Sequence, residues 1–280
     1  GSFSFDDYLL KPGDNATVEL VFSEVVTGFD SDDDITHPEG TLSAMTLDTS
    51  DNITWTGTFT PIFDDTTQDW INTLSLGTNY TDIAGNTGTD NTSLNYMVDE
   101  IHPWVDNFTL SDTALKAGDN ATVTLVFSEP VDNFSSSNIT ASTLDNGNAS
   151  GTLATMTVDS SDNTTWTGTF TPAADTEDAS NTLSLGGPYY DTAGNTGTDN
   201  TTSNYEVDTL APTGSFSFTD YKLKPGDTPT VTLVFSEVVT SFSNDDITVA
   251  NLDNGTKSGT LAAMTLDTSD NITWTGTFTP

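Results

Sequence analysis

The chain repeats one sequence pattern three times, and this repetition limits the folds available to it. The octapeptide Thr-Trp-Thr-Gly-Thr-Phe-Thr-Pro begins at Thr54, Thr165 and Thr273, so the copies are spaced by about 110 residues. That period is too long for one turn of a solenoid and is the size of one independently folding β-sandwich domain. The repetition therefore predicts an array of similar modules.

The repeat also predicts the domain boundaries. Repeat one spans 1–103, repeat two spans 104–212 and repeat three spans 213–280. Repeat three stops after the fifth expected strand, without the last two. We interpret the sequence as a window from a longer protein; the alternative is that a neighbouring chain supplies the missing strands.

The large excess of acidic over basic residues limits the kinds of partner that the chain can bind. The chain has 42 acidic residues against 5 basic ones, which gives a formal net charge of −37. Such a chain repels nucleic acid and anionic membranes, so we expect neither as a partner. It also repels itself unless cations screen or bind it, which points to divalent metal, to salty surroundings or to both.

Other sequence features are less specific. The chain contains no cysteine, so packing or metal must stabilise it in place of disulfides. No apolar run approaches the length of a membrane span, and no signal peptide is present. These absences do not argue for a cytoplasmic location.

Alternation with a period of two predicts strands throughout, and no segment has a convincing helical period. Val18, Leu20 and Phe22 share one face of a strand, while Thr17 and Glu19 point to the other. With repeat two as the template, seven strands are expected near Phe108–Leu110, Ala121–Phe127, Asn138–Leu144, Gly151–Val158, Thr165–Phe170, Thr182–Leu185 and Ser203–Val207. Seven short strands in a module of this length predict an all-β fold of tandem immunoglobulin-like antiparallel β-sandwiches. The joints 98–103 and 207–212 are short and contain Pro, so an extended rod is expected.

The repeat resembles a known family. The segment 110–131, the Asp-Thr-Ala-Gly-Asn element at 191–195 and the Val-Asp-Thr-Leu-Ala-Pro joint at 207–212 are similar to the bacterial Ig-like repeats of giant surface adhesins and biofilm proteins. Repeat one departs at its joint, where Asp-Glu-Ile-His-Pro stands in place of Asp-Thr-x-Ala-Pro. The resemblance implies tandem extracellular stalk modules on the cell surface, with calcium bound by acidic residues near the joints.

The best metal candidates lie at domain ends, where carboxylates and Asn carbonyls offer the oxygen ligands that calcium prefers. They are the loop residues Asp82, Asn86, Asp191 and Asn195, and the exit residues Asp99 and Asp208. Asp82 and Asp99 need not share an ion; Asp99 is expected to join residues of the following repeat, such as Glu129. The alternative for Asp-x-Ala-Gly-Asn is a tight turn that uses Asp and Asn on its own backbone.

Three glutamates recur directly after a buried strand, at Glu24, Glu129 and Glu237. They are either metal ligands or turn-capping acceptors. The acidic run 30–34 resembles the start of a calcium loop but has Ile35 where an EF-hand needs Gly, so a solvated acidic loop is expected there.

Catalysis finds little support. The only histidines, His37 and His102, do not recur, and the chain has no Cys, Arg or Gly-x-Ser-x-Gly element, so we expect no enzyme.

The leading hypothesis is an extracellular spacer or filament segment whose partners are its neighbouring repeats and, in a filament, other copies of the chain. One alternative is an adhesive module for carbohydrate, ice or a cell surface, for which the unrepeated Trp70 and Trp104 are candidates for exposed aromatic residues. The other is a strand-donating filament subunit.

Overall fold

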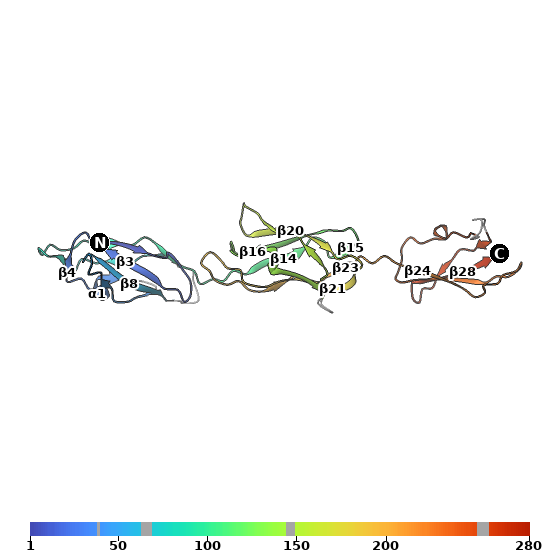
Figure 1. The fold of residues 1–280 in the computed structure, drawn as a ribbon, viewed down its shortest axis with the longest axis horizontal. Coiled ribbons are helices and arrows are strands. Elements are labelled where there is room, and N and C mark those ends of the chain that lie inside the picture. The colour runs from blue at the N-terminus through green and yellow to red at the C-terminus, as the bar shows by residue number, and fades with distance from the viewer. Residues whose placement is uncertain (38–39, 63–68, 144–148, 251–257) are drawn as a thin grey trace. The chain divides into compact units, whose positions relative to one another are not determined.

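The computed structural model describes residues 1–37, 40–62, 69–143, 149–250 and 258–280. The chain divides into two compact units, Gly1–Asp208 and Thr209–Pro280. The first unit carries two hydrophobic cores, one for each of the first two sequence repeats, and the second unit carries a third core (Figure 1).

Strands are the main regular structure of repeat one. Within the described ranges its strands are β1 (Ser2–Phe5), β2 (Leu9–Leu10), β3 (Ala16–Val21), β4 (Val26–Thr27), β5 (Ile35–Thr36), β6 (Gly40–Leu42), β7 (Thr46–Leu47), β8 (Thr54–Pro61), β9 (Asp69–Asn72), β10 (Ser75–Leu76), β11 (Thr81–Asp82), β12 (Asn91–Thr92) and β13 (Tyr96–Val98). One sheet has the order β1-β3-β8-β6, with β7 beside β8. The other strands pair as β2-β13-β9, β12-β10-β5 and β11-β4.

Repeat two has two five-stranded sheets. Its described strands are β14 (Val105–Leu110), β15 (Ala114–Lys116), β16 (Ala121–Phe127), β17 (Ile139–Thr143), β18 (Gly151–Leu153), β19 (Thr157–Val158), β20 (Thr165–Pro172), β21 (Glu177–Leu185), β22 (Asn200–Thr201) and β23 (Tyr205–Asp208), and a 3-10 turn, η1, spans Ser136–Asn138. One sheet has the order β14-β16-β20-β18 with β19 beside β20, and the other has the order β15-β23-β21-β17 with β22 beside β21.

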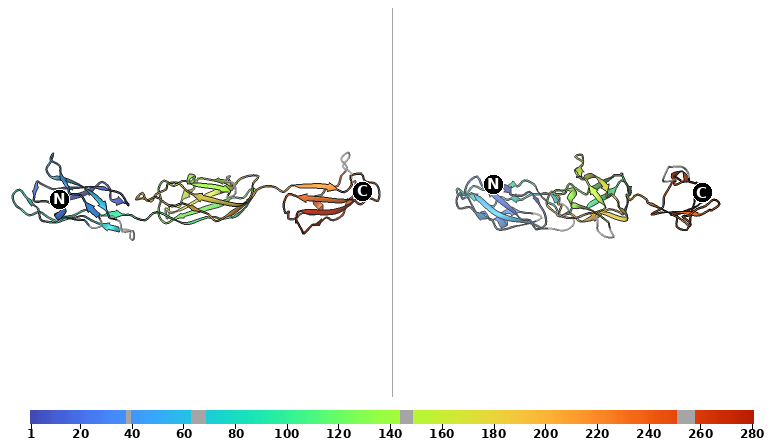
Figure 2. Two further views of the ribbon diagram at one scale, coloured as in Figure 1. Left: turned by 90° about the horizontal axis from the view of Figure 1, so that it is seen from below. Right: turned by 45° about the vertical axis from the view of Figure 1, so that its right-hand side comes forward.

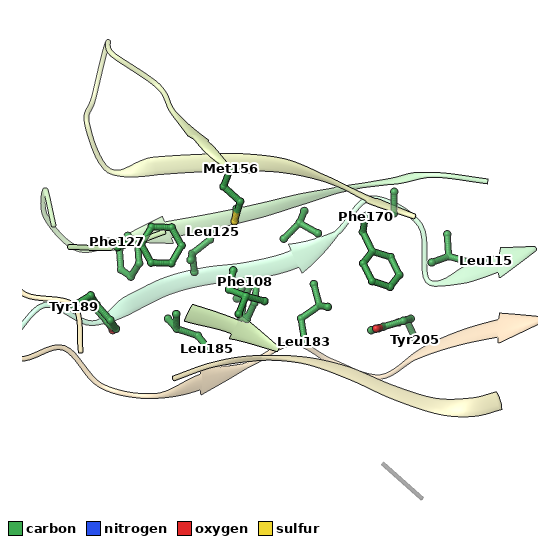
Figure 3. Packing of buried hydrophobic residues seen from close by; sticks show 14 of the residues in the cluster. Phe108, Leu115, Leu125, Phe127, Met156, Phe170, Leu183, Leu185, Tyr189 and Tyr205 are labelled. Carbon is green, nitrogen blue, oxygen red and sulfur yellow. The ribbon is translucent and has the colours of Figure 1, made fainter. Parts of the chain in front are cut away.

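The core of repeat two lies between these sheets because each strand turns its apolar residues to one face. At one end Phe127 packs against Tyr189, with ring centroids 4.9 Å apart, and at the other Phe170 packs against Tyr205 at 5.4 Å (Figure 3). The glycine of the repeated octapeptide belongs to this packing. A Cβ at Gly168 would lie 2.8 Å from Met156 Cγ, so a larger residue would displace that side chain.

The unit Thr209–Pro280 has one described sheet. Its strands are β24 (Gly214–Phe218), β25 (Thr230–Phe235), β26 (Thr260–Leu261), β27 (Thr265–Leu266) and β28 (Thr273–Thr279), with a 3-10 turn, η2, at Asn244–Asp246. The order is β24-β25-β28-β26, with β27 beside β28, and these strands run side by side in one layer (Figure 2). Among the described residues of this unit, no strand pairs in the manner of β21 and β23.

The predicted all-β class of tandem Ig-like modules is confirmed. The prediction for β16 matches its bounds, whereas the single strand expected at Gly151–Val158 is two strands, β18 and β19. Two short strands of repeat two, β15 and β22, were not predicted. β15 pairs with β23 in parallel, as β2 does with β13, so the sandwich is not purely antiparallel. The predicted end of the third strand at Leu144 lies outside the described residues.

The acidic run of repeat one forms a short helix, α1 (Ser31–Asp34), where a solvated loop was expected. Asp30 caps it, because its carboxylate accepts a hydrogen bond from the Asp32 amide at 3.0 Å. Asp34 at the end of the helix is buried and accepts from the Asp30 amide with Oδ2 at 2.9 Å. Its Oδ1 is buried without a hydrogen-bond partner. In repeat two the corresponding residue is Asn138, which accepts from the Ser135 amide in the same way.

We predict that Asp34→Asn stabilises repeat one by about 1 kcal/mol, because it replaces an unpaired buried carboxylate oxygen with a neutral amide. Thermal unfolding measured by calorimetry checks this. Asp32→Asn, on the exposed side of the same helix, is the matched control and should leave the transition nearly unchanged. An Asp34→Asn variant that melts at the wild-type temperature or below would contradict the prediction.

Candidate metal centre

Three carboxylates converge at the start of repeat two. One oxygen from each of Asp99, Glu129 and Asp191 lies within 4.8 Å of the others. Asp99 lies in the joint after β13, Glu129 lies in the segment after β16, and Asp191 follows directly after Tyr190. Asp99 is 6% exposed and Asp191 is 2% exposed, so two of the three charges are taken out of water.

A short backbone pairing brings Glu129 and Asp191 together. The Asp132 amide donates to the Tyr190 carbonyl at 2.6 Å, and the Tyr190 amide donates back to the Asp132 carbonyl at 3.1 Å. Glu129 lies just before this bridge and Asp191 directly after it. Repeat one has the same pairing, between β4 and β11.

The Asp-Thr-Ala-Gly-Asn element holds Asp191 in a closed turn. The Asn195 amide donates to Asp191 Oδ1 at 2.8 Å, and the Asn195 side-chain amide donates to Asp191 Oδ2, also at 2.8 Å. The same side-chain nitrogen donates to the Asp99 carbonyl at 2.9 Å. Asn195 is therefore buried between the loop and the joint, and it fixes the distance between them.

Asp99 is held from both sides. Its amide donates to the Leu10 carbonyl of repeat one at 2.8 Å, while its carbonyl accepts from Asn195 of repeat two. Its carboxylate accepts from the Ile101 amide at 3.1 Å, which forms a local Asx turn. The joint residue thus turns its carboxylate toward the acids of repeat two.

No ion pair among the described residues neutralises the cluster. Within the described ranges each ion pair joins a lysine to the aspartate three residues on, at Lys11, Lys116 and Lys224, and none reaches the three converging acids. Burial, followed by the charges of Asp99 and Asp191, raises the pKa of Glu129 from 4.5 to about 7. Concentrated negative charge and partial desolvation are conditions that a bound divalent cation would relieve.

The corresponding residues of repeat one are more open. Asp82 and Asn86 form the same turn, and the hydrogen bond from the Asn86 side chain lowers the pKa of Asp82. Glu24 is exposed and lines a small cavity of about 150 Å³ with both residues. In the described structure they do not form a group of three acids. Asp82 and Asn86 form the tight turn that was weighed as the alternative to a metal loop.

The last two predicted residues differ from their counterparts in repeat two. Asp208 ends β23 and is exposed, whereas Asp99 is buried. Glu237 belongs to the unit Thr209–Pro280 and is half-buried. Neither residue joins a converging group among the residues that the structure describes.

Sequence reasoning paired Asp99 with Glu129, and the structure places them together. It treated Asp191 as part of a separate loop and missed that this loop completes the same cluster. The contact arises from the isolated bridge between Asp132 and Tyr190, which has no signal in the spacing of the residues.

We predict that the cation-free chain loses stability as the pH rises through the pKa of Glu129. The folded pKa of about 7 lies above the ordinary value of 4.5, so the contribution of this group is fully present below pH 4.5 and is lost by about pH 7. Thermal unfolding in chelator at pH 5 and pH 8 measures the loss. Glu129→Gln should show a smaller drop than the wild type.

Glu24→Gln is the matched control for this experiment, because Glu24 occupies the same position in repeat one but is exposed. It should keep the wild-type pH dependence. Equal pH dependence in Glu129→Gln and the wild type would show that ionisation of the buried Glu129 carboxyl does not act on stability.

Membrane-span and family features bear on the class of protein to which the chain belongs. No helix among the described residues is long and apolar enough to cross a membrane. No curated protein matches the sequence. A family model described as "Bacterial Ig-like domain" matches residues 2–98, 99–207 and 208–280. These bounds make Asp99 and Asp208, which lie within the predicted joints 98–103 and 207–212, the first residues of the second and third matched segments. Such domains are typical of surface proteins and generally non-catalytic. The chain belongs to the bacterial Ig-like domain family, of which it carries three tandem copies.

Proposed function

We propose that the chain is a structural spacer segment of a surface protein, in which calcium bound by Asp99, Glu129 and Asp191 stiffens the joint between repeats one and two. The observation that carries the proposal is the position of Asp99. Its backbone is hydrogen-bonded to both repeats, and its carboxylate lies in the acidic cluster of repeat two.

The donor set fits calcium. Carboxylate oxygens are hard ligands, and the chain has no cysteine, so a soft metal would have no thiolate to bind here. Calcium takes six to eight oxygens in a flexible arrangement, whereas magnesium demands near-ideal octahedral geometry. Three carboxylates drawn from separate segments at a chain joint suit the more tolerant ion.

Binding at this cluster would act on the joint mechanically. Without a cation, the burial and the like charges of Asp99 and Asp191 that raise the pKa of Glu129 favour separation of the three segments. With a cation, the same charges attract one centre, and the joint residue Asp99 becomes attached to the strand end at Glu129 and to the loop at Asp191. Bending at the joint would then require breaking ligand bonds.

The function that follows is mechanical rather than catalytic. Each of the first two repeats buries its own core, so length can be added module by module. The extended rod, the extracellular location and the exclusion of nucleic acid as a partner stay predictions of this role. The adhesive alternative also stays a prediction. Its candidate Trp104 is 48% exposed, and the side chain of Trp70 is outside the described structure.

We expect calcium to raise the melting temperature of the chain and chelator to reverse the effect. A ligand that binds only the folded state at one hundred times its Kd stabilises that state by about 2.7 kcal/mol. Calorimetry with calcium and with EDTA measures this for the wild type and for Asp99→Asn, which should lose most of the response.

Asp208→Asn provides the matched control, because Asp208 follows the same Tyr-x-Val strand end but is exposed and outside the cluster. This variant should respond to calcium as the wild type does. An unchanged melting temperature with calcium in the wild type would remove the metal from the account, while leaving the family and the fold in place.

A further inference from the structure

One hairpin turn recurs in all three repeats. It joins β7 to β8, β19 to β20 and β27 to β28, and in repeat two the loop beside Met156 extends away from the packed core (Figure 3). An asparagine stands in each turn, at Asn52, Asn163 and Asn271. Their φ angles are 64°, 60° and 61°, in the left-handed region that Asn adopts more readily than most residues. The chain therefore presents an asparagine at the same turn once per repeat.

Each of these asparagines begins an Asn-x-Thr sequence, which is the acceptor pattern for N-linked sugar. The third residues of the pattern are Thr54, Thr165 and Thr273. The Thr165 hydroxyl donates to Asp162 Oδ2 at 2.7 Å, and the same bond measures 2.6 Å in repeat one and 2.7 Å in the last repeat. Each hydroxyl oxygen is held in place by this bond and keeps lone pairs that can accept another hydrogen bond. The acceptor pattern thus has the same conformation in each repeat.

The carboxamides of the three turn asparagines are accessible. Asn52, Asn163 and Asn271 are all exposed. Within the described part of the chain, none of them makes a side-chain hydrogen bond. An amide nitrogen is a weak nucleophile because its lone pair is delocalised into the carbonyl group. A transferase therefore has to enclose the carboxamide to activate it, and an exposed, unbonded side chain permits this.

Most other asparagines with the same sequence pattern have bonded side chains. The Asn15 side-chain oxygen accepts from the Thr60 hydroxyl at 2.6 Å, and Asn120 accepts from the Thr171 hydroxyl at the same distance. Side-chain hydrogen bonds also hold Asn91, Asn107, Asn133 and Asn138. These carboxamides belong to the fold, so attaching a sugar to them would break a bond of the native structure.

The remaining patterns lack one property of the turn asparagines. Asn79 is exposed, but Pro188 takes its place in repeat two, and Asn200 is half-buried. The patterns that begin at 148 and 254 lie outside the described residues. Asn52, Asn163 and Asn271 are therefore the described set that is exposed, unbonded and present in all three repeats.

We propose that Asn52, Asn163 and Asn271 are acceptor sites for N-linked sugar, one on each repeat. The donor is a diphosphate-activated sugar. The asparagine Nδ2 attacks the anomeric carbon of this sugar, so a nitrogen–carbon bond forms and the anomeric carbon–oxygen bond breaks. The diphosphate leaves with the electron pair of the broken bond, and one Nδ2 proton passes to a base of the transferase. The transfer requires no oxidant or reductant.

Mass spectrometry of the full chain, isolated from the cells that produce it, tests the proposal. Electron-transfer fragmentation should locate sugar on Asn52, Asn163 and Asn271, and the sugar should survive the alkaline β-elimination that removes sugar from Ser and Thr hydroxyls. Asn15 and Asn120 are the internal controls and should be unmodified. A single-sugar increment would identify a nucleotide-linked donor and an oligosaccharide increment a lipid-linked donor, and both support the acceptor sites.

Two variants of repeat two sharpen the test. Asn163→Gly should fold as the wild type does, because Gly adopts a positive φ without strain, and it should lose the sugar of repeat two alone. Thr165→Ser should keep that sugar, because Ser supplies the hydroxyl that the pattern needs. Ordinary masses for the peptides of all three turns, or sugar attached only to hydroxyl groups, would overturn the proposal. Equal modification of Asn15 and Asn120 would overturn the selection of the turns by their exposure.

Discussion

The structure depends on one constraint, which is that a sheet with one apolar face needs a second layer to cover it. In repeat two the alternation of β16 sends Val123, Leu125 and Phe127 inward, and β21 and β23 supply the opposing residues. Burial of the two faces is the main favourable term in folding such a module.

The acidic residues are distributed in a way that leaves this core untouched. The sheet that contains β16 and β20 carries one acidic residue, Asp106, among its strands, although the chain as a whole has a formal net charge of −37. Other acidic residues lie at turns, at joints and at exposed strand positions such as Glu177 and Glu206, where water or cations can screen them. At one joint the screening by water is reduced, because Asp99 and Asp191 are buried beside Glu129. A bound cation would therefore lower the repulsion between carboxylates most at this joint.

Sequence patterns predicted the strands whose residues alternate clearly between apolar and polar. The bounds of β16 follow from clean alternation between buried and wet positions, which needs no knowledge of the partner strand. β15 was missed because its three residues, Ala114–Lys116, become a strand only through pairing with β23.

The same distinction applies to the acidic cluster. Asp99 and Glu129 could be paired from the sequence because each lies just after the end of a predicted strand. Asp191 joins them through the backbone bridge between Asp132 and Tyr190, a contact that residue spacing does not reveal. The most direct measurement is anomalous diffraction from crystals grown with calcium. The account predicts a peak about 2.3–2.6 Å from oxygens of all three carboxylates. A map with only water there, or with Glu129 turned away to solvent, would contradict it.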